Sequence, residues 1–344
     1  MTSDNNRTDK HFDYQFISKH NPVIQLPHPD IKTEGKKYYM QHFPPLVNKL
    51  YARLKLNADK LNGYKKIKKL FHEKMGYELN LDSPKSYNEK IIWKKLHDRN
   101  PLLTVTADKY SVRSYLKELL GKHEAEKILI PVYHVTDNPG SIPFEELPEK
   151  FVVKPNHGSQ MHLIVTGDKE KIKARIREKC KKWLKINYGL YSHEWAYRNI
   201  SRKIIIEKLL QSEDGSLPKD IKLYCFHGKC RFLRASENRF DKEMLSAYFD
   251  LNWNLLPVHN PGYDIMKNPF EKPSNLDEMI RLGEKLSAKF DAVRVDLYNL
   301  EGKIYFGELT HYDGSGMARF KPESFDFEMG SYWKTDRNYW KNSK

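Results

Sequence analysis

Two carboxylates in the C-terminal third of the chain interrupt apolar runs at a spacing that suits metal chemistry. Asp296 stands in VRVDLY, Glu308 stands in YFGELT, and the Glu301-Gly302 pair between them predicts the turn of a hairpin. Side chains two residues apart on a strand share a face, so Arg294 lies beside Asp296. A charge in a buried strand needs compensation, which bound Mg²⁺ would supply. Taken alone, these residues fit a salt-bridged cluster equally well.

The segment FVVKPNHGSQMHLIV is a candidate phosphate site. A strand ends at Lys154, a loop with His157, Gly158 and Ser159 follows, and another strand begins near His162. Backbone N–H groups in such a loop can cover phosphates while a lysine supplies a positive point charge. The segment lacks the spacing and the following helix of a Walker loop, so by itself it is a weak signal.

A third candidate is KIIIEKLL, followed after a gap by DIKLY. A strand that ends in an exposed segment can offer backbone groups to a purine edge, and Asp220 can accept a hydrogen bond from a ribose hydroxyl. The same residues also fit an ordinary strand followed by a surface aspartate.

The elements that must position these residues follow from the hydrophobic periodicity. Helical patterns fill the region before the first strands. Ser86 and Glu89 form a capping box at the start of one helix. A second helix is expected from about Ala107 to Leu120, and it stops at Gly121, a suitable position for a left-handed cap. Groups of short β-branched strands follow, separated by helices at 169–186 and 275–289. His227-Gly228 predicts a second hairpin.

This order of elements predicts an α+β fold with two lobes, because the strands do not alternate regularly with helices. We expect four parts. These are a polar tail (1–40), a helical N-terminal region (41–135), a first lobe with the phosphate loop (136–210), and a second lobe with the metal site and the C-terminal segment (211–344).

Composition excludes several classes of protein. The 344 residues carry 31 % charged and 12 % aromatic residues, and the aromatic content argues against a disordered chain. Three cysteines without metal spacing exclude a disulfide framework and argue against structural zinc. The sequence shows no long apolar run of the kind that a signal peptide or a spanning helix needs, so we expect a cytoplasmic protein.

The net charge of +15 is concentrated in two segments. Residues 49–74 hold nine Lys or Arg and two acids, and residues 171–185 hold eight and one, so each contributes +7. Either segment can be a solvated helix face, or a surface for acidic polysaccharide or for lipid headgroups at the inner face of the cytoplasmic membrane. Nucleic acid is not expected as a partner, because no zinc finger, RNP-like motif or helix-turn-helix is present.

In this order, the segments from about residue 78 to 325 resemble the ATP-grasp superfamily, and more closely the TupA-like ATP-grasp group found in bacterial polysaccharide loci. The resemblance implies two α+β lobes that hold ATP between them, preceded by a helical N-terminal region. The stretches that carry it are SYNEKIIWKKLHDRNPLLT, ADKYSVR, FVVKPNHGS, FDLNWNLLP, VRVDLYN and GKIYFGELT.

The resemblance also implies roles for individual residues. Lys109 and Lys154 match the two lysines that ATP-grasp enzymes place on ATP phosphates, and Arg294 matches the arginine beside the transferring phosphoryl and acyl group. Asp296 and Glu308 match the carboxylates that bridge Mg²⁺. The remaining nucleotide residues implied are the covering loop (His157, Gly158, Ser159), the adenine hinge (Glu207, Lys208, Leu209, Leu210), the ribose acid Asp220, and a basic group on the next strand, Lys222.

Two departures from the family pattern are visible. Thr310 stands where the third metal ligand is usually asparagine, and a hydroxyl is a poorer ligand than an amide oxygen. The covering loop has one glycine, Gly158, where many ATP-grasp loops have several. Neither departure removes a carboxylate or a lysine.

The expected function is an ATP- and Mg²⁺-dependent carboxylate–amine ligase that forms an amide through an acyl phosphate. The resemblance implies a uronic acid carboxylate of a capsular or O-antigen polysaccharide, free or lipid-linked, joined to an amino acid or small amine. The alternatives are a phosphotransferase or glycosyltransferase on the same polysaccharide, and a degenerate protein that binds nucleotide or glycan without turnover.

Overall fold

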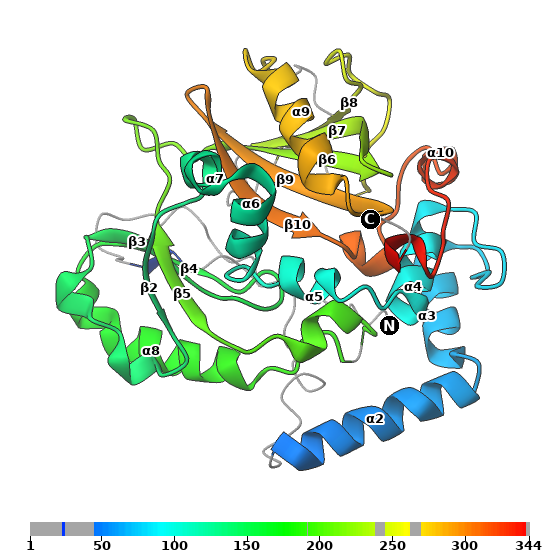
Figure 1. Ribbon diagram of the computed structural model, residues 1–344, viewed down its shortest axis with the longest axis horizontal. Helices are drawn as coiled ribbons and strands as arrows, with labels where there is room; N and C mark the ends of the chain where they lie inside the picture. Colours follow the sequence, from blue (N-terminus) through cyan, green and yellow to red (C-terminus); the bar gives the residue numbers. More distant parts are fainter. Residues whose placement is uncertain (1–22, 25–44, 191, 238–244, 262–269, 342–344) are drawn as a thin grey trace, which may run out of the picture.

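The computed structural model describes residues 23–24, 45–190, 192–237, 245–261 and 270–341 (Figure 1). The predicted polar tail, residues 1–40, lies outside this set apart from Val23–Ile24, which form the short strand β1 and pair with β4. Among the described residues, no helix combines the length and the apolar composition needed to cross a membrane.

Helices fill the N-terminal part of the described chain, and one of them differs from the prediction. The expected helix from Ala107 to Leu120 is wrong at its start, because Asp108 breaks it: its carboxylate accepts hydrogen bonds from the N–H groups of Tyr110 and Ser111. Gly121 follows with φ 85° and ψ 149°, a glycine conformation other than the predicted left-handed cap. The helices observed here are α2 (Pro45–Leu61), α3 (Lys65–Met75), α4 (Tyr87–His97), α5 (Leu102–Ala107), α6 (Val112–Leu120) and α7 (Lys122–Ile128).

The first sheet, called sheet A, has five antiparallel strands in the order β1-β4-β3-β5-β2. Helix α8 (Lys169–Lys185) buries Ile172, Ile176, Cys180 and Trp183 in the core of this sheet. The strands after β1 are β2 (Val132–Thr136), β3 (Lys150–Pro155), β4 (Leu163–Thr166) and β5 (Ile204–Lys208), and short 3₁₀ helices lie at Pro139–Ser141, Phe144–Glu146 and Trp195–Asn199.

The second sheet, called sheet B, has five antiparallel strands in the order β10-β9-β6-β7-β8. Helix α9 (Leu276–Ser287) packs on one face, and Gly283 permits the close approach, since a Cβ there would lie 2.5 Å from Cδ2 of Leu223. The strands are β6 (Lys219–Phe226), β7 (Lys229–Glu237), β8 (Leu245–Phe249), β9 (Ala292–Leu300) and β10 (Lys303–Thr310); α10 (Ser324–Ser331) and 3₁₀ helices at Asp313–Gly316 and Tyr339–Lys341 follow.

Both predicted hairpins are present, and the predicted α+β class is confirmed. His227-Gly228 joins β6 to β7, and Glu301-Gly302 joins β9 to β10. All four turn residues have positive φ, the conformation that matches the twist of a tight hairpin. The Ser86–Glu89 capping box at the start of α4 is also formed. In Figure 1 the two sheets lie in separate halves of the molecule, with α5 and α6 between them.

Candidate active site

The β9–β10 hairpin places both predicted metal carboxylates on one face of sheet B. Asp296 lies directly opposite Glu308, and Arg294 lies directly opposite Thr310. A bulge makes this possible, because Gly307 is an extra residue between Phe306 and Glu308. Without the bulge, Phe306 and Glu308 would share a face; with it, Phe306 joins the apolar core while Glu308 faces the site.

The Asp296 carboxylate is held by cations from two strands. Arg294 donates from Nε to Oδ1 and from a terminal nitrogen to Oδ2, both at 2.7 Å. Lys222, opposite Asp296 on β6, donates to Oδ2 at 3.1 Å and to Asp220 at 2.5 Å. The ribose acid and the basic group implied by the resemblance thus belong to one set of ionic contacts with the predicted metal carboxylate. This set, called the Asp296 row, consists of Asp220, Lys222, Asp296 and Arg294.

Arg294 connects this row to the neighbouring residues of the site. Its terminal nitrogens also donate to Asp313 and, at 3.1 Å, to Oγ1 of Thr310, which itself donates to Glu308 at 2.9 Å. Burial disfavours the guanidinium charge, but Asp296 and Asp313 raise the pKa of Arg294 well above its ordinary value. The guanidinium is therefore fixed as a cation in one orientation.

Lys109 links sheet B to the phosphate loop. It lies between α5 and α6, and its Nζ is 3.3 Å from Oε2 of Glu308 and donates to the carbonyl of Gly158 at 2.6 Å. Three segments far apart in the sequence therefore meet at one amine, at the point where the resemblance places the ATP phosphates.

Asn156 holds this junction together, and sequence reasoning missed it. Its fully buried amide nitrogen donates to Asp108 at 2.9 Å and to the carbonyl of Ser201 at 2.8 Å, and its amide oxygen accepts from the N–H of Lys203 at 2.7 Å. Its backbone carbonyl accepts from the N–H of Lys109 at 2.9 Å. The only sequence signal was its position directly before the HGSQ loop.

The covering loop is packed against the segment that follows α8. Gly158 has φ 81°, and a Cβ there would lie 2.6 Å from a ring carbon of Tyr188. Ser159 and Tyr188 share a hydrogen bond between their hydroxyls at 2.8 Å. The His157 ring is buried, and burial, with Arg202 and Lys109 nearby, lowers its pKa to about 3. The imidazole is therefore neutral, so His157 offers a phosphate no positive charge.

In sheet A, Lys154 pairs with Glu207 at 2.5 Å instead of joining the Asp296 row. The N–H of Lys208 is already used, because it donates to the carbonyl of Pro131 at 2.9 Å. Leu209 and Leu210 are buried, and Leu210 forms an apolar cluster with Ile130 and Tyr305. This buried cluster, which the sequence did not reveal, fixes the end of the predicted hinge against β10.

The residues present fit Mg²⁺ by their chemistry. Mg²⁺ is usually bound by one or two carboxylates together with phosphate and water oxygens, and Asp296, Glu308 and the Thr310 hydroxyl offer such oxygens on one face. Two carboxylates directly opposite each other repel, and Arg294, Lys222 and Lys109 compensate them here. Within the described ranges, no three His, Cys, Asp or Glu side chains form a ready-made metal cluster. The metal role therefore stays a prediction.

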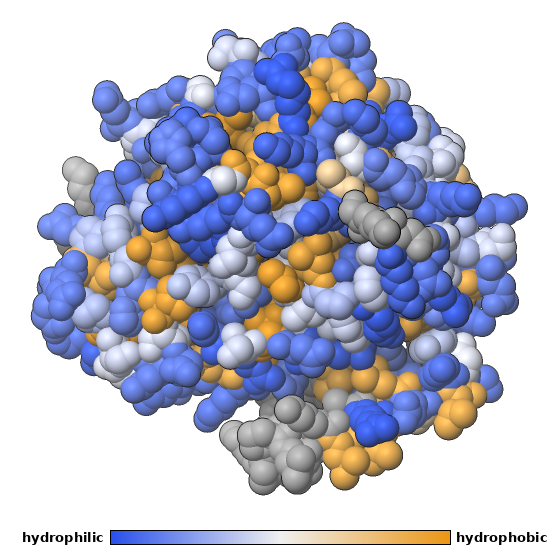
Figure 2. All heavy atoms as spheres, in the orientation of Figure 1, coloured by the Kyte–Doolittle hydropathy of each residue, from blue (hydrophilic) through white to orange (hydrophobic). Residues whose placement is uncertain are grey.

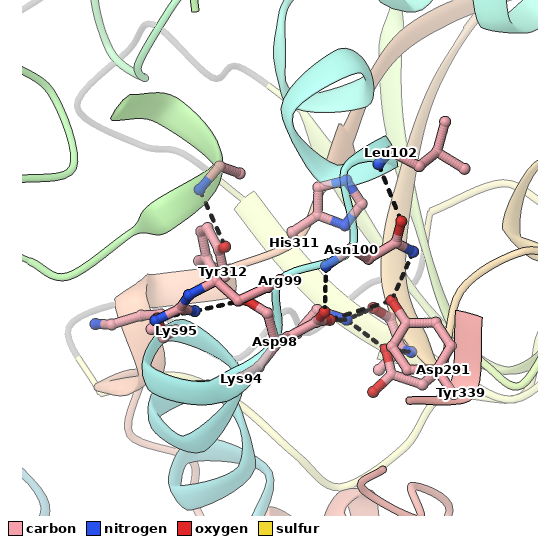
Figure 3. Close-up of polar contacts among 12 residues, drawn as sticks. Lys94, Lys95, Asp98, Arg99, Asn100, Leu102, Asp291, His311, Tyr312 and Tyr339 are labelled. Carbon is pink, nitrogen blue, oxygen red and sulfur yellow. Dashed lines mark hydrogen bonds and ion pairs between the residues drawn. The ribbon is translucent and has the colours of Figure 1, made fainter. Parts of the chain in front are cut away.

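A buried polar network connects the start of β9 to α4 and to the C-terminal segment. Figure 3 shows Lys94 of α4 and Asp98, the residue that follows α4, pointing toward Asp291, the residue before β9. Lys94 pairs with Asp291 and lies 3.4 Å from Asp98, and the two carboxylates raise its pKa despite complete burial. Asp291 also accepts from the indole N–H of Trp333 at 2.8 Å, so the network joins α4 to the C-terminal segment.

The same network explains much of the KKLHDRNPLLT stretch. Asp98 accepts from the N–H of Asn100 at 2.9 Å, and Asn100 accepts from the N–H of Leu102 at 2.9 Å, which sets the entry into α5. His311 is buried and shares a 2.7 Å hydrogen bond with Thr106. Burial lowers the pKa of His311 well below its usual value, so this histidine has a structural contact and no charge.

Two antiparallel sheets, with Lys109 joining the phosphate loop of one to the carboxylate hairpin of the other, form an ATP-grasp fold. Residues 89–334 match the family described as TupA-like ATPgrasp, and the chain belongs to this family. No curated protein matches the chain.

Solved structures similar to this chain are ligases by their descriptions, and one of them is described as an ATP-grasp ligase. D-alanine–D-alanine ligase from Bacillus anthracis is 18 % identical with a TM-score of 0.38, and the match covers 62 % of this chain and 59 % of that one. The enzyme of the same name from Helicobacter pylori is 17 % identical with a TM-score of 0.36, covering 67 % and 62 %. The ATP-grasp ligase PsnB, in complex with a phosphomimetic precursor variant, Mg and ADP, is 10 % identical with a TM-score of 0.36, covering 68 % and 61 %.

Proposed function

We propose that this protein is an ATP-dependent carboxylate–amine ligase. The observation that carries the proposal is the junction at Lys109, whose Nζ lies within 3.3 Å of Glu308 and donates to the phosphate loop at Gly158. Membership of the ATP-grasp family supports ATP as the energy source. No side-chain nucleophile is needed, because an acceptor carboxylate itself attacks ATP.

In the first step, an oxygen of the acceptor carboxylate forms a bond to the γ-phosphorus, and the bond to the β,γ-bridging oxygen breaks to release ADP. Lys109 and Lys154 neutralise the charge on the phosphoryl oxygens as the group moves. Asp296 and Glu308, with Thr310 beside them, would hold Mg²⁺, which would supply further positive charge at this site.

In the second step, an amine nitrogen attacks the acyl carbon, and the tetrahedral adduct loses inorganic phosphate and a proton to give the amide. Arg294 is suited to stabilise the developing oxyanion, because Asp296 and Asp313 fix its guanidinium in advance.

For the substrates, we propose a uronic acid carboxylate of an acidic polysaccharide or lipid-linked oligosaccharide, joined to an amino acid or other small amine. The support is the TupA-like family match, whose resemblance implies uronic acid chemistry, and the net charge of +15, which suits a polyanionic acceptor.

A non-catalytic binding protein is the second candidate, and two observations favour it. Both Asp296 oxygens already accept hydrogen bonds from Arg294 or Lys222, and a threonine hydroxyl at position 310 is a weak metal ligand. In this alternative, the carboxylates serve the ionic network and no ADP is formed.

ADP release by the purified protein, with acidic oligosaccharides and a panel of amino acids, separates the candidates. A ligase forms ADP only when Mg²⁺ and a uronate are present, and hydroxylamine traps the acyl phosphate as a hydroxamate. ADP formation without a trappable acyl group would indicate a phosphotransferase. No ADP formation across all uronate and amine mixtures would favour the binding protein.

A further inference from the structure

Helix α2 presents a row of leucines to the surface. The exposed fractions are 58 % for Leu50, 60 % for Leu54 and 88 % for Leu61. Residues four and eleven positions apart return to the same side of an α-helix, so the three side chains form one stripe. Asp59 lies on the opposite side of the helix and binds His193 at 3.1 Å, which orients the stripe away from the body.

Exposed cations continue from α2 into α3. Between residues 53 and 74, seven Lys or Arg side chains are exposed, and Glu73 is the exposed acid among the side chains that the structure describes there. The seven cations are Arg53, Lys60, Lys65, Lys66, Lys68, Lys69 and Lys74. Helix α3 adds a fourth exposed leucine, Leu70, at 42 %. In Figure 2, apolar atoms gather over α2 at the lower edge of the molecule, next to strongly hydrophilic residues.

The other basic segment, residues 171–185 of α8, has the same net charge of +7 with a different apolar side. Its Ile172, Ile176, Cys180 and Trp183 are buried in the core of sheet A. Among the described residues of α8, no large apolar side chain is exposed. Positive charge alone attracts any polyanion, whereas exposed leucines flanked by cations match a surface with anionic groups above an apolar layer.

We propose that α2 and α3 form a docking surface for an anionic lipid membrane. The leucines of α2 enter the boundary between headgroups and acyl chains, and the flanking lysines and arginines contact the headgroups. The helices lie along the membrane surface and do not cross it. This inference does not rest on the proposed ligase activity, because membrane binding requires neither ATP nor an acceptor.

The first test is co-sedimentation of the full chain with vesicles of phosphatidylglycerol and phosphatidylcholine, compared with phosphatidylcholine alone. We expect binding to the mixed vesicles that weakens as salt rises. Replacing Leu50, Leu54 and Leu61 by Gln keeps helix propensity and lowers the affinity on the order of tenfold or more. Leu217→Gln, at a leucine 37 % exposed outside this surface, is the matched control and leaves binding unchanged.

The second test removes equal charge from the two basic helices. Lys65, Lys66, Lys68 and Lys69 replaced by Gln weaken vesicle binding and flatten its salt dependence. Lys171, Lys181, Lys182 and Lys185 on α8, replaced in the same way, have a smaller effect. Circular dichroism checks that all variants fold.

Several results would overturn the proposal. These are equal losses from both lysine sets, an unchanged affinity in the leucine variant, or a leucine-dependent dimer that binds no vesicles. Binding to soluble polyuronate through the same lysines, without vesicle binding, would assign the surface to an acidic glycan instead.

Discussion

The two sheets hold their charged residues in different ways. In sheet B, the Asp296 side chain is 5 % exposed and bound by cations from two strands, and Arg294 is bound in turn by Asp313. In sheet A, Lys154 and Glu207 form one pair whose side chains are 18 % and 10 % exposed. The charged residues of sheet B therefore form a preorganised network in which each charge depends on its neighbours. In sheet A, Lys154 has one partner, Glu207, which it can exchange for another.

This difference fits the proposed chemistry. A residue that stabilises a developing oxyanion works best when its orientation is fixed before the reaction, as for Arg294. A lysine that receives ATP must leave a temporary partner when the nucleotide binds, as proposed for Lys154. The following predictions test this contrast, beginning with the largest expected effect.

Asp296→Asn affects both activity and stability, because it removes the charge at the centre of the sheet B network. We expect ADP formation to fall on the order of 10²–10³-fold or more. We also expect the free energy of unfolding to fall by about 3 kcal/mol, since Arg294 and Lys222 lose a buried counter-charge. Coupled-enzyme assays and urea unfolding measure the two effects, with Asp277→Asn on the exposed start of α9 as control. Near-normal ADP release would contradict the metal assignment.

Lys154→Ala separates catalysis from stability. ADP formation falls on the order of 10²–10³-fold, as for the loss of one charge that stabilises the transferring phosphoryl group. The free energy of unfolding falls less than in Asp296→Asn, because one ion pair is lost instead of a network, although Glu207 is left without this partner. The same assay and urea titration apply, and Lys150→Ala, on an exposed lysine of the same strand, is the control. A destabilisation as large as that of Asp296→Asn would remove the contrast between the sheets.

Asn156→Ala weakens the junction between the sheets. Asp108, Lys203 and Ser201 each lose a buried hydrogen-bond partner. Leaving such groups unsatisfied costs about 1–3 kcal/mol, and thermal unfolding measures the loss. Asn138→Ala, whose side chain caps a surface 3₁₀ turn, serves as the comparison and has a smaller effect. Equal losses in both variants would show that Asn156 holds no special position.

Thr310→Asn has the smallest expected effect and refines the account of the metal site. An amide oxygen is a better ligand than a hydroxyl, so the Mg²⁺ concentration for half-maximal ADP formation falls about two- to fivefold. Thr310→Val, which keeps the shape and removes the hydroxyl, shifts that concentration the other way. If both variants behave like the natural protein, residue 310 contributes nothing to metal binding.

Much of the fold was predictable because its signals are local. The β-branched runs, the turns at His227-Gly228 and Glu301-Gly302, and the capping box at Ser86 each depend on neighbours in the chain. The placement of Asp296 beside Arg294 followed from strand periodicity alone. The break before α6 was missed because the Asp108 side chain competes with the helix for backbone N–H groups.

The sequence by itself determined which charged groups exist, which strands carry them and where the basic segments lie. Only the tertiary structure decided which of these groups meet. The Gly307 bulge turns Glu308 toward Asp296, and Asn156 and Lys109 join segments separated by tens of residues. The physical reason is that periodicity specifies a face of one element, while packing between elements selects partners. The same packing buries the apolar side of α8 and leaves the leucines of α2 exposed.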